Sequence, residues 1–140
     1  MKKSVFFLAF LLFILHTALQ DLPGQASSEP VRVLLLMDDD YGANYNIDDE
    51  SMNIDELIKS FGWTYDIAGL KDTLYPCETA AGYYGRGPVV ADLPVSGVDL
   101  SRYAVVMVMP GRSHKNLMQS EEAMQLIREA VSAGKVVAGW

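Results

Sequence analysis

Two short, almost wholly apolar segments limit this chain to a small set of folds. The segment 31–37 contains one charged residue, Arg32, and the segment 104–109 contains none. Strands covered on both faces have such continuous apolar sequences, whereas half-exposed strands alternate apolar and polar residues. We therefore expect both segments to lie inside a parallel sheet with helices on each of its faces, an α/β architecture.

The first of these strands is followed by a predicted helix and a second strand. Apolar side chains at helical spacing predict a helix over 54–61, and Gly62 is placed to end it. Asn53 and Glu56 have the spacing of a capping box at its start. The alternating segment 63–70 is a predicted strand, which completes a strand–helix–strand unit.

The second apolar segment is followed by the same order of elements. Ser120 is the predicted N-cap of a helix whose first turn holds two glutamates, which the helix dipole favours. The predicted buried stripe of this helix comprises Ala123, Leu126, Ile127, Ala130 and Val131. Gly134 is placed to end the helix, and 135–140 is then a predicted short, central, buried strand.

The first thirty residues have the features of an export signal. Two lysines precede the apolar run 5–15, which is shorter than the about 20 residues that a membrane-spanning helix needs. Small residues near Ala26 predict cleavage after it, so that 1–26 is a signal peptide, 27–30 a short polar tether and 31–140 one domain. We expect a secreted or periplasmic protein with no stable membrane insertion after cleavage; an uncleaved anchor is the alternative.

Charge and cysteine content narrow the classes of partner and chemistry. The formal net charge is −7, and an acidic surface repels phosphate backbones, so no nucleic-acid partner is expected. Cys77 is the one cysteine, which excludes an intrachain disulfide. It falls in the segment 71–96, the least regular part of the sequence, in which only 88–92 suggests a short strand. A reactive thiol needs an electropositive setting at a helix end, so an inert Cys77 is the favoured interpretation over a substitute nucleophile.

Three acids, Asp38, Asp39 and Asp40, follow the first predicted strand. Grouped carboxylates at the carboxyl end of a strand can bind a hard cation such as Mg²⁺, and receiver domains of response regulators are similar in this respect. The segment 105–108, where a receiver would carry its phosphoacceptor, has no acid, and the EF-hand spacing for Ca²⁺ is absent. Solvation of the strand end is the simpler interpretation, and we expect no cofactor.

A longer series of motifs spans the last third of the chain. A strand ends in Pro110-Gly111, a helix opens with acids, and Ala133-Gly134-Lys135 precedes a further strand. This series closely resembles the ThiJ/PfpI family of the class I glutamine amidotransferase-like superfamily, which includes the Parkinson-protein deglycase. The resemblance extends over 31–140 and implies a flavodoxin-like open parallel sheet with helices on both faces, which often forms a homodimer. It also implies that the chain stops just before the family's reactive cysteine, so that the domain is incomplete at its C-terminus.

The same resemblance assigns roles to individual residues. It places the family's conserved glutamate at Glu50, the carboxyl partner of the missing cysteine, although the helix dipole alone would favour an acid at this position. Gly111 and Arg112 would form the turn that supplies the oxyanion pocket, with Arg112 in place of the family's second glycine. The family's histidine usually follows the cysteine, so His114 is a candidate for that role only if its loop faces the site.

The resemblance implies a cysteine-dependent hydrolase or lyase of the peptidase, glyoxalase or deglycase type. Its substrate would be a small molecule or a peptide. Because the nucleophile is absent, we expect the 140-residue chain to be inactive by that mechanism. The alternative is a non-enzymatic module that binds a partner or ligand, for which dimerisation would cover the free sheet edge.

Overall fold

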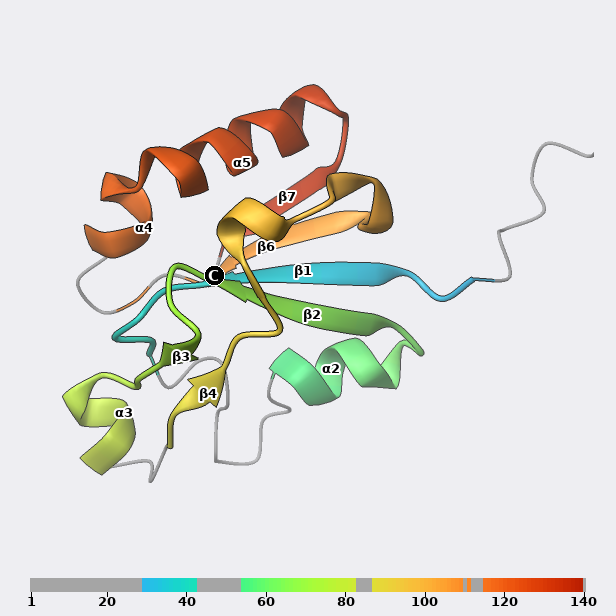
Figure 1. Ribbon diagram of the computed structural model, residues 1–140. Coiled ribbons are helices and arrows are strands. Elements are labelled where there is room, and N and C mark those ends of the chain that lie inside the picture. The colour runs from blue at the N-terminus through green and yellow to red at the C-terminus, as the bar shows by residue number, and fades with distance from the viewer. Residues whose placement is uncertain (1–28, 43–53, 83–86, 110, 112–114, 140) are drawn as a thin grey trace, which may run out of the picture.

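The centre of the fold is a sheet of five parallel strands in the order β5-β2-β1-β6-β7 (Figure 1). We describe it from a computed structural model, which covers residues 29–42, 54–82, 87–109, 111 and 115–139. The strands are β1 (Arg32–Met37), β2 (Thr64–Gly69), β5 (Leu93–Pro94), β6 (Val105–Met109) and β7 (Val136–Gly139). A separate antiparallel pair joins β3 (Thr73–Leu74) to β4 (Val89–Val90). The predicted open parallel α/β sheet is therefore confirmed.

Helices cover both faces of this sheet. The α-helices are α2 (Ile54–Ser60), α3 (Glu78–Gly82), α4 (Lys115–Gln119) and α5 (Glu121–Ser132), and two 3₁₀ helices are η2 (Val95–Gly97) and η3 (Leu100–Arg102). Figure 1 shows α5 above the sheet and α2 below it. No helix in the described ranges is long and apolar enough to cross a membrane.

Strand β1 supplies side chains to two separate layers of core. Leu34 and Leu36 pack on the side of α5, in a cluster with Val106 and Leu126. Alternate residues of β1 point the other way and pack with residues of α2; these are Val33, Leu35 and Met37, with Ile54 and Ile58. Since successive strand residues face opposite sides, a strand buried on both faces must be apolar throughout, as 31–37 is.

The predicted N-cap of α5 and the glycine that ends each main helix are also confirmed, whereas Asn53 of the predicted capping box lies outside the described residues. The Ser120 hydroxyl accepts a hydrogen bond from the backbone N–H of Ala123 at 3.2 Å, which satisfies one of the free donors of the first turn of α5. Gly62 and Gly134 follow α2 and α5 with φ values of +71° and +69°. A residue with a side chain would be strained in this left-handed conformation, so glycine is the natural helix stop at both points.

Several sequence expectations are wrong in detail. Strand β7 has β6 as its one neighbour in the described sheet, and its Val136 is 61% exposed, so this strand is less buried than its apolar sequence predicts. Val131 and Phe61 are 60% and 62% exposed, so the buried stripes of α5 and α2 are narrower than the apolar pattern indicates. The segment 71–96 contains β3, α3, β4, β5 and the start of η2 rather than one short strand. Elements of two to five residues are too short to show a periodicity in sequence.

Candidate functional site

Three loop segments meet where the strands of the main sheet have their carboxyl ends. Tyr41 forms a parallel bridge with Pro76 and an antiparallel bridge with Gly111. Its carbonyl accepts a hydrogen bond from the backbone N–H of Cys77 at 2.9 Å, and its own N–H donates to the Tyr75 carbonyl at 3.2 Å. The loop after β1, the segment after β3 and the turn after β6 are therefore joined through one residue. In open parallel sheets this edge is where ligands bind.

Gly111 approaches the acidic loop more closely than any other residue type could. A Cβ atom at this position would lie 2.6 Å from the Asp39 carbonyl oxygen and 3.0 Å from that of Asp40. Both atoms belong to the backbone, so neither can turn aside as a flexible side chain would. The close approach explains the glycine in Pro110-Gly111 and fixes this turn against the loop that follows β1.

The Asp39 carboxylate connects this loop to the segment after β2. It accepts hydrogen bonds from the Lys71 ammonium group at 2.5 Å and from the Tyr75 backbone N–H at 2.8 Å. Partial burial alone would raise the pKa of Asp39, but these two hydrogen bonds and the charge of Lys71 outweigh it, so that the pKa lies below its usual value. Asp39 is therefore ionised, and its carboxylate connects two segments of the fold instead of being available to a cation.

Asp38 is fully buried, which the sequence did not indicate. Its backbone N–H donates to the Met109 carbonyl at 3.1 Å, and its Oδ2 accepts a long hydrogen bond from the N–H of Leu117 at 3.4 Å. Its Oδ1 has no hydrogen-bond partner among the described residues. The interpretation that the three acids solvate the strand end is therefore wrong for Asp38.

The described residues offer no cluster for a metal ion. No three histidine, cysteine or carboxylate side chains in that part of the chain lie close enough together to share one. Asp40 has φ +67°, a left-handed conformation that aspartate tolerates better than most residues. Its backbone N–H donates to the Tyr75 carbonyl at 2.9 Å, so the structure gives Asp40 a place in a sharp turn.

Only some of the predicted site residues lie among the residues that the structure describes. Gly111 lies at the carboxyl edge as expected. Glu50, Arg112 and His114 fall outside the described residues, and their proposed roles stay predictions. Tyr41, which sequence reasoning did not single out, is 3% exposed and donates its hydroxyl to the Gly87 carbonyl. Nothing in the sequence beyond an aromatic residue after the acids indicated this central position.

Cys77 also lies near this edge, in a setting that differs from the expectation. It falls between β3 and α3, a strand–turn–helix context, rather than in an irregular loop. Its thiol is free but only 4% exposed, and its backbone N–H is bonded to Tyr41. Such burial keeps reagents and substrates from the sulfur, which favours the interpretation as an inert thiol.

Strand β7 brings its carboxyl end to the same place. In the register of β6 and β7, Val108 pairs with Gly139, so Gly139 lies level with the residue two before Pro110. Strand β1 flanks β6 on its other side, with Met37 paired to Met109. The carboxyl ends of β1, β6 and β7 therefore lie along one edge of the sheet, with β6 between the other two.

The fold has clear counterparts among solved structures, although no family model and no curated protein sequence matches the chain. A ThiJ/PfpI domain protein from Brachyspira murdochii superposes with a TM-score of 0.63 at 17% identity, over 79% of this chain and 59% of that one. Oxidised DJ-1 from Toxoplasma gondii gives 0.55 at 18% identity, over 78% and 54%. The putative protease I from Bacteroides thetaiotaomicron gives 0.56 at 11% identity, over 78% and 62%.

These matches show that the chain has the fold of ThiJ/PfpI and DJ-1 superfamily proteins, so the resemblance seen in the sequence is confirmed at the level of fold. The chain spans less than two thirds of the length of each of these three structures. Identities this low carry no information about which reaction, if any, is shared.

Proposed function

We propose that the carboxyl edge of this sheet is the scaffold of a cysteine-dependent hydrolase or lyase site of the ThiJ/PfpI type. In this proposal the nucleophile is a cysteine that follows Trp140 in the full-length protein. The observation that carries the proposal is the packing of Gly111 against the backbone of Asp39 and Asp40, beside the end of β7. A side chain placed directly after β7 would project at the junction of these segments.

The chemistry follows from the groups that this edge brings together. A thiolate would attack a carbonyl carbon, and backbone N–H groups near the Gly111–Arg112 turn would stabilise the negative charge that develops on the oxygen. Glu50, as the carboxyl partner, would donate a hydrogen bond to the thiolate and hold it in its reactive form. His114 would be a further proton carrier if its loop faces the same space.

The remaining features of the proposal concern the protein outside the described residues. The proposal also includes export by the signal at 1–26, a small dicarbonyl-type or peptide substrate, and a homodimer. The fold supports a substrate-binding protein of this superfamily, since its members place their sites at this edge. The non-enzymatic binding module is the competing outcome of the experiment.

The experiment compares the 140-residue chain with the full-length protein read from the codons beyond Trp140. We expect a cysteine directly after Trp140 and turnover of methylglyoxal or a peptide ester by the longer protein. Replacing that cysteine by alanine should abolish turnover, and Glu50→Gln should reduce it by about 10²-fold or more, the usual effect of losing a positioned proton donor. The 140-residue chain and its Glu50→Gln variant should both be inactive.

Two results would refute this proposal. A stop codon after Trp140 would remove the nucleophile and leave the binding module as the function. Turnover by the 140-residue chain above that of its own Glu50→Gln variant would show that another group performs the chemistry. Cys77→Ala is the matched control in that case, because Cys77 is the one thiol of the chain.

A further inference from the structure

An apolar patch lies where α2 ends and β2 begins; we call it the aromatic patch, and its members are Leu57, Phe61, Trp63 and Tyr65. Leu57 and Phe61 are 37% and 62% exposed and are four residues apart, so they are neighbours on one face of the helix. The ring centroids of Phe61 and Trp63 are 5.3 Å apart, and Trp63 and Tyr65 pack, partly exposed, against the core cluster beneath α2. The patch is therefore continuous, unlike the single exposed apolar residues that most protein surfaces carry.

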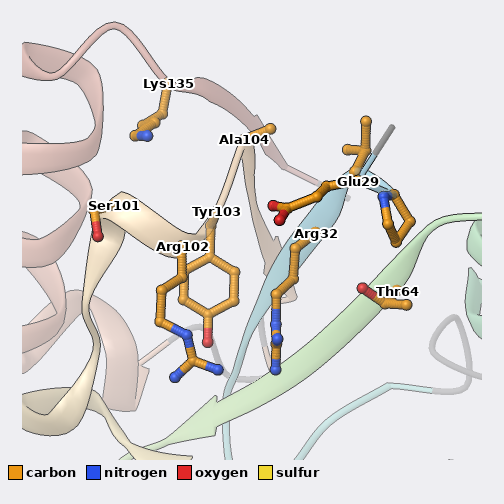
Figure 2. Close-up of a pocket in the computed structure, with 10 residues that line it drawn as sticks. Glu29, Arg32, Thr64, Ser101, Arg102, Tyr103, Ala104 and Lys135 are labelled. Carbon is orange, nitrogen blue, oxygen red and sulfur yellow. The ribbon is translucent and has the colours of Figure 1, made fainter. Parts of the chain in front are cut away.

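The aromatic patch lies at the amino edge of the main sheet, where the described chain begins. The backbone N–H of Thr64, next to Trp63, donates to the Val31 carbonyl at 3.0 Å, and Val31 packs against the same core cluster as Trp63. Figure 1 shows that α2 ends and β2 begins at the end of the sheet where β1 begins. In Figure 2, Glu29 lies beside Arg32 at this edge, with Thr64 on the neighbouring strand. The sequence before Glu29 is therefore connected to the domain beside the patch.

That sequence contains the apolar run 5–15. A run of this length is too short to span a bilayer, but it is typical of segments that enter the bilayer surface. The run ends at Leu15, so at most about 50 Å of extended chain separates it from Glu29. A short tether of this kind gives the domain an effective concentration on the order of millimolar at the surface that the run enters. Even a modest apolar patch beside the tether can then decide which side of the domain faces the lipid.

The charges at the amino edge do not oppose contact with a neutral lipid surface. Asp99 lies close enough to Arg102 and Lys135 for their charges to interact. The Arg32 guanidinium binds the Asp66 carboxylate at 2.7 Å, so these cations have acids as neighbours. The chain as a whole has a net charge of −7, which repels anionic headgroups. Zwitterionic headgroups are therefore the favoured partner, and tryptophan and tyrosine suit their interface with water.

We propose that the aromatic patch contacts the lipid surface that the run 5–15 enters, in the chain that keeps residues 1–26. Phe61 and Leu57 enter the interface, and Trp63 lies near the headgroups. The carboxyl edge of the sheet is roughly 20 Å away, since β1 has six residues at about 3.3 Å each. The proposed catalytic site then faces away from the membrane and is open to a dissolved substrate. The orientation follows from the patch and the tether, and it holds whether or not that site is catalytic.

Tryptophan quenching in the full 140-residue chain tests this orientation. The chain has two tryptophans, so Trp140→Phe leaves Trp63 as the one reporter. We expect phosphatidylcholine vesicles to shift the Trp63 emission to shorter wavelength, and the same lipid with brominated acyl chains to quench that emission. Adding Leu57→Ser/Phe61→Ser should make the emission equal in brominated and plain vesicles, although flotation should show that the chain still binds them through the run 5–15.

The matched control is Tyr75→Ser/Val90→Ser in the same background, because these apolar side chains are 58% and 70% exposed and lie outside the patch. It should keep the quenching of the Trp140→Phe chain, and circular dichroism checks that all variants are folded. Absence of quenching in the Trp140→Phe chain would overturn the orientation. Equal loss of quenching in both double variants, or no loss in either, would overturn the patch as the contact.

A second copy of the chain is the competing occupant of the aromatic patch. Sedimentation without lipid distinguishes the two, and we expect a monomer or a dimer that Leu57→Ser/Phe61→Ser leaves unchanged. A dimer that this double variant dissociates would show that a second copy covers the patch, and would overturn the lipid contact. Stronger quenching in brominated phosphatidylserine than in brominated phosphatidylcholine would overturn the choice of a neutral lipid surface.

Discussion

The Gly111→Ala substitution tests the contact on which the catalytic proposal depends. The new methyl carbon would lie 2.6 Å from the Asp39 carbonyl oxygen, and real Cβ contacts essentially never fall below 3.0 Å. The Asp39 backbone cannot yield alone, since its side chain is bonded to Lys71 and Tyr75. Overpacking usually costs about 1–3 kcal/mol, and we expect about 2–3 because backbone must move on both sides.

Urea unfolding followed by tryptophan fluorescence measures this difference. With an m-value of about 1–3 kcal/mol/M, the midpoint of the Gly111→Ala variant should fall by about 0.7–3 M. Gly42→Ala is the control, because a Cβ there has nothing within 4 Å and its φ is not positive. It should leave the unfolding free energy unchanged or raise it by up to about 1 kcal/mol through the unfolded state. Equal midpoints for the two variants would refute the packing of this turn against the acidic loop.

Four further outcomes follow from other contacts. Burial and the hydrogen bond to Asp66 raise the pKa of Tyr103 from 10.0 to about 12. The tyrosine of the unfolded chain therefore ionises first, and the free energy of unfolding should fall as the pH rises from 10 towards 12. Tyr103→Phe should flatten this fall in alkaline unfolding curves. The hydrogen bond from Arg32 outweighs burial and lowers the pKa of Asp66. The stability that the ionised Asp66 gives the fold should therefore be complete above about pH 4 and lost as the pH falls below that value. An Asp66→Asn variant whose stability has the same acid dependence as the parent chain would contradict this. Cys77 is 4% exposed and should react with Ellman's reagent only at the rate of unfolding; fast reaction of the native chain would show that the thiol is accessible. Asp38 has a buried oxygen with no hydrogen-bond partner among the described residues, so Asp38→Asn should leave the free energy of unfolding unchanged or raise it by about 1 kcal/mol. A loss of several kcal/mol would reveal a partner elsewhere in the chain.

The parts of the fold that could be predicted are those that repeat a pattern over several residues. The apolar run of β1 and the capped helix α5 were both recognisable, because burial on two faces and the needs of a helix end each leave a local signature. The exposure of Val136 in β7 was not, since the sequence of this strand is as apolar as that of a buried one. Val131 and Phe61 show the same limit, because an apolar side chain at the right spacing can still lie at the margin of a packed face.

The site was less predictable than the fold, for a physical reason. The glycine of the turn after β6 was identified from its motif, but its contact with the backbone of Asp39 depends on how two distant loops are folded. The burial of Asp38 and the central position of Tyr41 likewise arise from the pairing of β1 with β6 and from the segment after β3. Sequence spacing identifies residue types at strand ends, whereas only the sheet order decides which strand ends are neighbours.

The charges at the carboxyl edge restrict how a thiolate could be stabilised there. The Lys71 ammonium group lies close to two acids of this edge: it donates to Asp39, and its pKa is raised chiefly by that hydrogen bond, with a smaller contribution from Asp38. Carboxylates near a thiol raise the thiol pKa, so the acids of this loop do not by themselves stabilise a thiolate. A nucleophile at this edge, as we propose, would therefore draw its stabilisation from hydrogen-bond donors. In the proposal these are the N-terminus of a helix that follows the cysteine and a Glu50 carboxyl group that donates a hydrogen bond rather than adding charge.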